Sequence, residues 1–366
     1  MSETADILVI GGGIAGISAA ARMAPEASVI VLEAEDTIGR HATGRSAAIF
    51  ILNYGNMTLR ALNLASESEL LEPVGISDRS LLSPRGEMLI ASEADMPAFE
   101  AYLAGSVGMD RLTPKEAVEL FPLLRPEPIF AAAIERNAQE IDVDRLLQGF
   151  ARLLRHHGGK IVPEARAETI VRRDGVWHVE TPAGSFEAPI LVNAAGAWAD
   201  EVAATAGLRR LGLMPLRRSA AIVPLPDGQD SRSWPMVASA AENWYAKPEG
   251  GKLMVSPADE DLVEPHDAWP DDMVLAEGLD RFEKAMTMEV TRVERTWAGL
   301  RTFAPDRSPV VGFAPDGEGF LWLAGQGGYG VQTSPALSRL AADIALGRQP
   351  VLGQQTVAAV APARFF

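Results

Sequence analysis

Three glycines near the start of the chain have the spacing of a dinucleotide-binding turn. Gly11, Gly13 and Gly16 follow the apolar run of residues 6–10 and open a stretch of small residues, which indicates a turn between a strand and a helix. Such glycines permit the tight turn, let a pyrophosphate approach the backbone, and let the helix pack closely on the strand. Glu33 ends the next apolar run, residues 29–32, where a carboxylate can accept hydrogen bonds from a ribose. The pattern predicts a site for NAD or FAD.

Three later segments favour the longer flavin dinucleotide. Residues 43–48 offer a cation and hydroxyls for a loop that passes over a pyrophosphate and a ring face. Residues 192–198 follow a buried strand and are mostly small, so a cofactor could lie against their backbone. Residues 325–333 form a glycine-rich loop before a helix, whose N-terminus would stabilise the negative charge of a reduced flavin. Contacts spread from residue 11 to residue 333 fit a long ligand, so we expect FAD.

In this order, the four segments resemble the D-amino-acid-oxidase (DAO) type of FAD-dependent oxidoreductase. Within that family the likeness is greatest to the bacterial FAD-dependent D-arginine and D-amino-acid dehydrogenases, through residues 43–48, 82–88, 217–220, 297–301 and 325–334. The resemblance implies an α/β fold, with a glutathione-reductase-like Rossmann FAD-binding domain and a substrate domain built on a mainly antiparallel sheet. The expected cofactor-binding residues are Gly11, Gly13, Ile14, Ala15, Gly16, Glu33, Arg45, Ser46, Ala47, Ala48, Ala167, Ala195, Gly196, Trp198, Gly327, Gly328, Tyr329, Gly330, Val331, Gln332 and Thr333.

The elements that must position these residues are helices and short strands. Helical patterns occur at about residues 58–72, 96–107, 144–157, 197–207, 275–290 and 334–346. Short strand-like runs at about 86–91, 217–224, 234–239, 243–247 and 252–256 are separated by turn residues and suit an antiparallel sheet. We therefore expect a discontinuous FAD-binding domain (1–80, 140–212 and 298–366) interrupted by a substrate-binding domain (81–139 and 213–297).

The resemblance also implies a reaction and the residues that carry it. The reaction would be oxidative deamination of D-amino acids, with a hydride passing from Cα to flavin N5 and a 2-oxo acid and ammonia as products. Arg301 and Arg218 would hold the substrate carboxylate, Arg301 through two parallel hydrogen bonds. Tyr54 and Tyr245 would hydrogen-bond the carboxylate or the amine, and the Gly328 carbonyl would accept from the amine. The expected catalytic residues are Tyr54, Glu87, Arg218, Tyr245, Arg301 and Gly328.

Glu87 bears on the side chain of the substrate. By the same resemblance its carboxylate faces the distal cation of an arginine-like substrate. Ile49 and Ile51 stand where the arginine-directed enzymes carry polar His and Thr, and Met236 and Ala238 are further expected liners of the side-chain pocket. Such a pocket favours D-Leu, D-Met, D-Phe or long basic side chains over compact polar ones. A strict preference for D-arginine is therefore not expected.

Two features remain without an assigned role. The substrate segments contain no histidine in a position for proton transfer, so Tyr54, Tyr245, an ordered water or direct binding of the neutral amine are all open as routes for the amine proton. The acidic segment 259–267 is interrupted by Pro265, which predicts a solvated loop without chemistry.

Composition and charge exclude several classes of function. The 366-residue chain has 33 basic and 49 acidic side chains and a net charge of −16, which disfavours nucleic acids and anionic membranes as partners. It has no cysteine, so a flavin cannot be attached through sulfur and we expect non-covalent FAD. Its five histidines lack the spacing of metal ligands. The first residues lack the basic region of a signal peptide and the apolar run after them is broken by glycines, so we expect a cytoplasmic protein.

Two other functions stay open. A glycine- or sarcosine-type oxidase of N-methyl or secondary amines would share the fold and the carboxylate-binding arginines. A non-catalytic FAD-binding electron-transfer subunit would share only the cofactor site and would need no carboxylate clamp. The electron acceptor (O₂, a quinone or a dye-like carrier) and the oligomeric state do not follow from the sequence.

Overall fold

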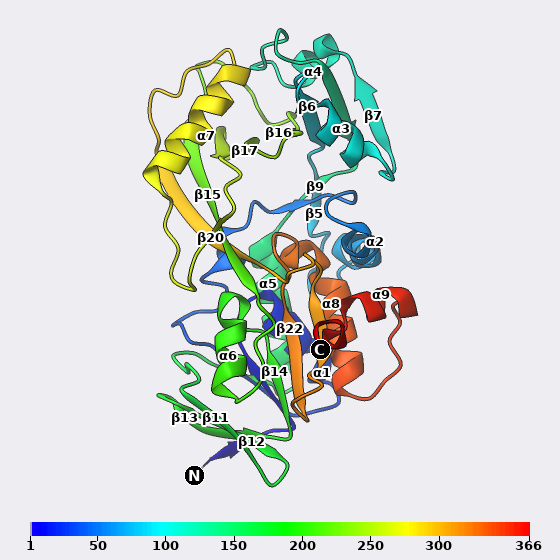
Figure 1. Cartoon of the computed structure of the whole chain (residues 1–366), viewed down its shortest axis with the longest axis vertical. Helices are drawn as coiled ribbons and strands as arrows, with labels where there is room; N and C mark the ends of the chain where they lie inside the picture. The colour runs from blue at the N-terminus through cyan, green and yellow to red at the C-terminus, as the bar shows by residue number, and fades with distance from the viewer. Residues whose placement is uncertain (1) are drawn as a thin grey trace.

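The lower lobe of the molecule contains a six-stranded, mostly parallel sheet (Figure 1). The computed structural model describes residues 2–366. The sheet order is β10-β3-β2-β14-β22-β21, and β21 alone is antiparallel to its neighbour. β2 and β3, the strands before and after helix α1 in the sequence, pair in parallel, which confirms the predicted strand-turn-helix-strand unit. The bounds are β2 Ile7–Ile10, α1 Ile14–Met23, β3 Val29–Leu32, β10 Lys160–Val162, β14 Ile190–Asn193, β21 Val310–Phe313 and β22 Phe320–Ala324.

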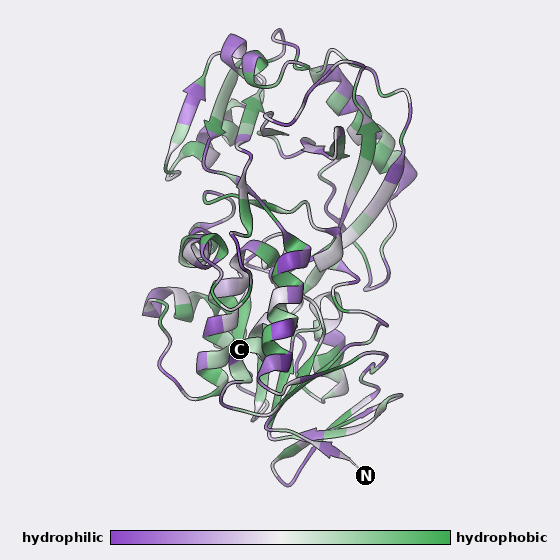
Figure 2. Cartoon of the chain, turned by 180° about the vertical axis from the view of Figure 1, so that it is seen from behind, coloured by the Kyte–Doolittle hydropathy of each residue, from purple (hydrophilic) through white to green (hydrophobic). Residues whose placement is uncertain are grey.

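Both faces of this sheet are covered, which explains why its strands are apolar at nearly every position. On one face Val9, Val31 and Val192 pack with helices α1, α5 (Val143–His156) and α8 (Gly330–Ala345), against which α2 (Met57–Leu71) and α9 (Gln354–Val360) lie. On the other face Leu8 and Trp322 pack with α6 (Ala199–Thr205) and a four-stranded sheet of order β1-β13-β12-β11. Figure 2 shows hydrophobic residues concentrated along the central strands. The bounds of the small sheet are β1 Glu3–Thr4, β11 Thr169–Arg173, β12 Val176–Thr181 and β13 Gly184–Ala188.

The upper lobe is built on a nine-stranded sheet of order β19-β15-β18-β17-β16-β6-β8-β7, with β20 paired to β15. All neighbouring pairs are antiparallel except β16 and β6, which are parallel, so the sheet is mainly antiparallel, as predicted. Together the two sheets confirm the α/β fold. The bounds are β6 Glu87–Ala91, β7 Met109–Leu112, β8 Ala131–Glu135, β15 Met214–Pro224, β16 Met236–Ser239, β17 Tyr245–Glu249, β18 Lys252–Ser256, β19 Asp261–Leu262 and β20 Arg295–Phe303.

The two faces of the nine-stranded sheet have different neighbours. Val237, Ala246 and Val255 face helices α4 (Pro114–Leu120) and α7 (Asp272–Ala285) in one hydrophobic cluster. Because side chains alternate along a strand, the residues between them face the opposite way, toward the lower lobe. Helix α3 (Met96–Leu103) and a three-stranded sheet of β4 (Ile49–Phe50), β9 (Gln139–Ile141) and β5 (Leu82–Pro84) complete this side. Within residues 2–366, no helix has both the length and the apolar composition required to cross a bilayer.

Candidate active site

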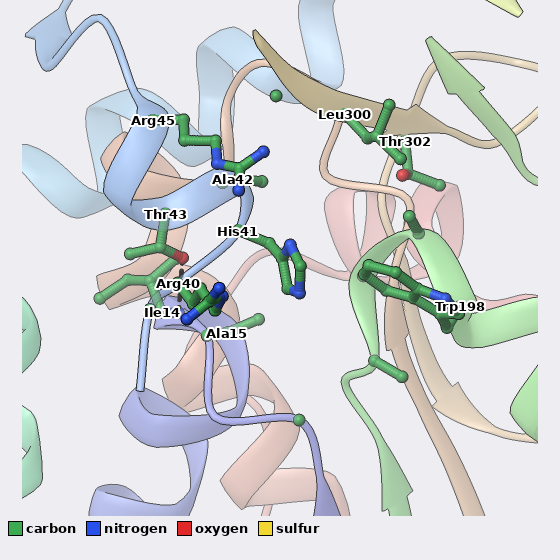
Figure 3. Close-up of a pocket in the computed structure, with 18 of the residues that line it drawn as sticks. Ile14, Ala15, Arg40, His41, Ala42, Thr43, Arg45, Trp198, Leu300 and Thr302 are labelled. Carbon is green, nitrogen blue, oxygen red and sulfur yellow. Dashed lines mark hydrogen bonds between the residues drawn. The ribbon is translucent and has the colours of Figure 1, made fainter. Parts of the chain in front are cut away.

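A long cavity runs between the glycine-rich turn of the lower lobe and the free face of the nine-stranded sheet. Its wall is formed by the β2–α1 turn, the end of β3, the short 3₁₀ helix Ala42–Arg45, the segment after β14, the middle of β20 and the loop before α8. Figure 3 shows Ile14, Ala15 and Thr43 on one side of this space and Trp198 across from them, with His41 between. The cavity therefore joins the segments that the sequence analysis assigned to a dinucleotide.

The three glycines of the turn have distinct structural roles. Gly11 has a φ of +111°, and a Cβ there would lie 2.4 Å from the Ala194 carbonyl oxygen. A Cβ at Gly16 would lie 2.0 Å from the Gly11 carbonyl oxygen, so both positions are closed to side chains by the fold itself. At Gly13 the nearest described atom to an added Cβ is Thr43 Oγ1, at 3.4 Å, and Gly13 lines the cavity. Gly13 is thus open on the side where a pyrophosphate would approach.

The charges around the turn suit the same ligand. The N-termini of α1 and α8 line the cavity. Their first turns, both within the described residues, contain no acidic side chain, so the partial positive charge of each helix N-terminus is not offset there. The Glu33 carboxylate is held by two backbone donors, Gly12 N at 2.7 Å and Glu35 N at 2.9 Å, and lines the cavity at the end of β3. The glycine-rich turn, the two helix N-termini and the Glu33 carboxylate together fit FAD.

The openness of Gly13 makes a prediction about cofactor affinity. Gly13→Val should weaken FAD binding by at least about 100-fold while the melting temperature of the apoprotein changes little, because the added methyl groups occupy the cofactor's space rather than the protein's. Titration of apoprotein with FAD, followed by flavin fluorescence, measures this. The matched control is Gly353→Val, where a Cβ meets nothing described within 4 Å and FAD affinity should stay the same. Equal FAD affinity in the wild type and Gly13→Val would contradict the assignment.

Arg45 lines the cavity, but its guanidinium is already engaged by protein groups. Nη1 donates to the Ala298 and Ala268 carbonyls at 2.9 and 3.1 Å, and Nη2 forms a salt bridge with Asp267. These contacts join the 3₁₀ helix to β20 and to the segment before α7. Arg45 therefore connects the two lobes, which differs from the expected free cation over a pyrophosphate.

Five of the expected cofactor residues lie outside the cavity wall, for identifiable reasons. Gly16 provides close packing within the turn, and Ala48 follows Ser46 at a φ of 58° with its N–H on the Ser46 hydroxyl. Tyr329 packs against Tyr54 and Phe303. The other two expected contacts, Gln332 and Thr333, form hydrogen bonds with Asn63 and with the Tyr329 carbonyl. The remaining expected residues, which the structure brings together along the wall, are Gly11, Gly13, Ile14, Ala15, Glu33, Arg45, Ser46, Ala47, Ala167, Ala195, Gly196, Trp198, Gly327, Gly328, Gly330 and Val331.

At the upper end of the cavity lies Arg301, on β20. Its Nη1 donates to the Tyr54 hydroxyl at 3.3 Å and its Nη2 to the Tyr245 hydroxyl at 3.5 Å. A Cβ at Gly328 would lie 3.0 Å from Arg301 Nη1, so the loop before α8 also packs directly on the guanidinium. Among residues 2–366, Arg301 has no carboxylate within salt-bridge distance. A half-buried cation held only by neutral oxygens favours binding of an anion.

The electrostatics of this group follow from its burial and neighbours. Burial works against the charge of Arg301, but the phenol oxygens of Tyr54, Tyr245 and Tyr329 raise the pKa of its guanidinium, so it stays cationic. Burial alone would raise the pKa of Tyr245, but the nearby charges of Arg301 and Arg218 bring it below its ordinary value. Both arginines therefore act on the same phenol.

Three of the four residues expected to line the side-chain pocket pack together, although none of the four lines the cavity itself. Ile49, Met236 and Ala238 pack in one cluster with Tyr245, whereas Ile51 lies outside that cluster and is buried, with its N–H on the Gln332 side chain. Along the strands, Tyr245 stands opposite Ala238, and Met236 stands beside Glu87. Opposed residues of neighbouring strands point to the same side, so all of these face the cavity side of the sheet.

Glu87 is buried rather than exposed at a strand end. It is 4% exposed, and within the described residues its Oε2 has no hydrogen-bond partner. Directly opposite on β8 stands Glu135, whose carboxylate accepts from Leu52 N at 2.8 Å and from Asn53 Nδ2 at 2.6 Å. Burial, with the negative charges of Glu135 and Glu242, raises the pKa of Glu87 to about 8. Glu87 does not line the cavity wall, and neither do Tyr54, Met236 and Ala238. Met236 and Ala238, on β16, lie between Glu87 and Tyr245, which does line it.

The raised pKa of Glu87 predicts a specific dependence of stability on pH. An unfolded glutamate titrates near pKa ~4.3, so between about pH 4.3 and pH 8 the folded state holds one more proton than the unfolded state. The free energy of unfolding therefore falls as the pH rises through that window. Glu87→Gln should remove this loss, stabilising the protein at pH 8.5 by on the order of 3–5 kcal/mol relative to its effect at pH 5. Urea unfolding at both pH values measures the free energy of unfolding, with Glu264→Gln as the exposed control. The prediction would be contradicted if that free energy changed by the same amount between the two pH values in the wild type and in Glu87→Gln.

Several wall residues were not predicted from the sequence. Thr302 on β20 lines the cavity with a buried hydroxyl that has no partner among the described residues, and Trp297 and Met254 line its upper part. His41 also lines it: its Nε2 lies 2.9 Å from Glu35 Oε1 and its ring packs on Trp198 at 4.7 Å between centroids (Figure 3). In the sequence, His41 could have been identified only from its position two residues before the predicted cofactor loop, which begins at Thr43.

Comparison with known proteins agrees with this geometry. The family described as DAO, FAD dependent oxidoreductase, matches residues 6–344. Dimethylglycine dehydrogenase of Homo sapiens is 25% identical over 383 residues, covering 95% of this chain and 43% of that protein. Glycine oxidase of Bacillus licheniformis is 24% identical and covers 95% of this chain and 94% of that protein. The solved structure of L-proline dehydrogenase from P. horikoshii superposes with a TM-score of 0.84 at 24% identity, covering 100% of this chain and 98% of that one. This chain thus spans less than half the length of dimethylglycine dehydrogenase.

Proposed function

The chain belongs to the DAO family of FAD-dependent oxidoreductases, and from that premise we propose that it deaminates D-amino acids with basic or hydrophobic side chains to 2-oxo acids and ammonia. The single observation that carries the proposal is Arg301. It is a half-buried guanidinium beside the cavity, flanked by Tyr54 and Tyr245 and without a carboxylate partner in residues 2–366. The α-carboxylate of an amino acid is the anion that this group can bind through two hydrogen bonds.

The same residues orient the carbon that reacts. Bound FAD would accept a hydride at N5, and the protein's task is to hold the substrate Cα–H toward that atom. Arg301 and Arg218 fix one end of the substrate. Gly328 packs against Arg301 and lines the cavity, and its carbonyl would accept from the amine. Tyr245, with its pKa lowered by both arginines, is one acceptor for the ammonium proton. Together these contacts place carboxylate, amine and Cα in a fixed order along the cavity.

The sheet itself sets the length of the substrate side chain. Tyr245 is on β17 and Glu87 is on β6, two strands away across β16. Tyr245 is level with Leu89, and Glu87 is two residues further along β6. Neighbouring strands are about 4.8 Å apart and each residue rises about 3.3 Å, so the two positions are separated by about 12 Å. An arginine- or lysine-length side chain that leaves the carboxylate clamp can cross Met236 and Ala238 and bring its cation to Glu87, whereas D-Leu or D-Met would end on the apolar part. This arrangement supports both classes of substrate.

A second candidate function is favoured by the comparisons. Dimethylglycine dehydrogenase, glycine oxidase and L-proline dehydrogenase are named for substrates without a long side chain, and two of these substrates are N-substituted amines. An N-methyl or secondary amine oxidase would also use Arg301 for the carboxylate. It would have no use for a buried carboxylate two strands away, and Glu87 is the feature that favours the first proposal.

The proposal is tested by turnover of the purified holoenzyme with an artificial electron acceptor. D-Arg, D-Lys, D-Leu and D-Met should each yield one 2-oxo acid and one ammonia per two electrons accepted, and their L-enantiomers should yield none. Formaldehyde from sarcosine, with no product from any D-amino acid, would instead establish the second candidate.

A further inference from the structure

The segment of residues 257–268, here called the strap, is anchored beside the substrate site. The prediction of a solvated loop over residues 259–267 is wrong for Asp259. The Asp259 side chain is 2% exposed and accepts from Ser219 N at 2.6 Å and from Ser219 Oγ at 2.8 Å. At its far end the strap contributes His266 and Ala268 to the cavity wall. The strap is thus a fixed part of the site, although its acidic composition alone suggested a surface loop.

The strap holds Arg218, the second arginine of the proposed carboxylate clamp. Arg218 Nε donates to the Asp259 carbonyl at 2.8 Å, and Nη2 donates to Glu260 Oε1 at 3.0 Å. Arg218 and Arg301 both line the cavity on the same face of neighbouring strands β15 and β20. Arg218 differs from Arg301 in one respect: it already has a carboxylate, that of Glu260. A substrate carboxylate must share this guanidinium with Glu260.

Arg307 also binds Glu260 and shares its Oε1 with Arg218. Its Nη1 lies 3.1 Å from Glu260 Oε2 and its Nη2 lies 2.9 Å from Oε1. Arg307 follows β20 in a turn, and its guanidinium sits over the Phe303 ring at 3.9 Å. The Glu260 carboxylate is therefore divided between an arginine at the cavity and an arginine whose side chain is 41% exposed.

Glu260 is charged at neutral pH. Burial opposes its ionisation, but the hydrogen bond and charge of Arg307 and the charges of Arg218 and Arg301 hold its pKa below the ordinary value. An anion at this place reduces the positive potential that a substrate carboxylate meets. Its effect is largest at Arg218, which it contacts, and it reaches Arg301 through space.

We propose that Glu260 is a specificity-determining residue of the carboxylate site: an internal carboxylate that competes with the substrate carboxylate for Arg218, with Arg307 drawing it toward the surface. This inference rests on the proposed function for the identity of the substrate anion. It requires that removing the charge of Glu260 strengthens binding of a monocarboxylate. It also requires that removing Arg307 weakens binding, because Glu260 then pairs with Arg218 alone.

The test is a titration of the oxidised holoenzyme with an unreactive monocarboxylate, 4-methyl-2-oxopentanoate, followed by the change in the flavin absorbance spectrum. Glu260→Gln should lower the Kd by about tenfold. Arg307→Gln should raise the Kd several-fold, and the double variant should bind like Glu260→Gln alone, because Arg307 acts through Glu260. The matched control is Glu264→Gln, an exposed carboxylate of the same strap, which should leave the Kd unchanged.

The outcomes separate this inference from the proposed function. An unchanged or higher Kd in Glu260→Gln, repeated in Glu260→Ser in case glutamine retains the contact, would overturn the competition. An Arg307→Gln effect that persists in the Glu260→Gln background would overturn the link between the two residues and leave only a general effect of charge. Failure of every amino acid to reduce the wild-type flavin would contradict the proposed function instead, and the carboxylate titration does not depend on that reduction.

Discussion

Replacing Arg301 by alanine is expected to lower kcat/KM for every amino-acid substrate by about 10³-fold or more while the protein retains its FAD. Arg301 is a half-buried cation without a carboxylate partner in the described chain, so the substrate carboxylate loses its main contact and Tyr54 and Tyr245 lose their shared donor. Removing one partner of a buried, hydrogen-bonded charge pair costs about 2–5 kcal/mol, and misplacement of Cα adds to that loss. Steady-state kinetics with D-Leu and D-Arg measure the loss of kcat/KM, and the flavin spectrum of the variant measures the retention of FAD.

Two controls make this result specific. Arg301→Lys keeps the charge but not the two parallel donors, so it should recover only part of the activity. Arg295→Ala removes an exposed arginine from the same strand and should change kcat/KM little. An unchanged kcat/KM in Arg301→Ala with FAD bound would remove Arg301 from the carboxylate site.

Glu87→Leu is expected to separate basic from apolar substrates. The variant should lower kcat/KM for D-Arg and D-Lys by about 100-fold, because their cations lose the only acid proposed to face them, while D-Leu should change by no more than a few-fold. D-Leu serves as the control within the same protein preparation. Equal losses for D-Arg and D-Leu would remove Glu87 from the side-chain pocket.

The protonation of Glu87 adds a second readout to this experiment. With a pKa raised to about 8 by burial and by Glu135 and Glu242, the side chain is a neutral acid at pH 6.5 and a carboxylate at pH 9. The wild-type preference for D-Arg over D-Leu should therefore rise with pH across this range, and Glu87→Leu should have no such rise. The ratio of the two kcat/KM values, measured at each pH, cancels effects on the flavin that both substrates share.

Much of the lower lobe could be predicted because its signals are local. The glycine spacing, the apolar strands and Glu33 all lie within the first 33 residues, and the structure pairs β2 with β3 around α1 as predicted. The sheet of the upper lobe was harder, because its strands come from distant segments. β20 was not predicted as a strand, and the parallel pairing of β16 with β6 joins residues about 150 positions apart, which no local pattern encodes.

The roles of single residues in the candidate site show the same limit. Arg45 had the right type and position for a pyrophosphate contact, but its partners Asp267 and Ala298 lie more than 200 positions away and engage its guanidinium. Asp259 was read with its charged neighbours as a solvated loop, whereas the fold buries it against Ser219. In both cases a contact distant in sequence decided the outcome. Arg301, by contrast, was identified by resemblance, and the structure brings it to Tyr54 and Tyr245.

The most direct test of the central claim is the anaerobic visible spectrum of the purified protein during addition of D-amino acids, their L-enantiomers, glycine and sarcosine. We predict that D-Arg, D-Lys, D-Leu and D-Met bleach the flavin spectrum and that the L-enantiomers leave it unchanged. Bleaching by sarcosine alone would establish the N-methyl amine oxidase instead. A bound flavin that no amine reduces would contradict an amine-oxidising function and leave a cofactor-binding subunit, and a protein unable to bind FAD would contradict the reading of the glycine-rich turn.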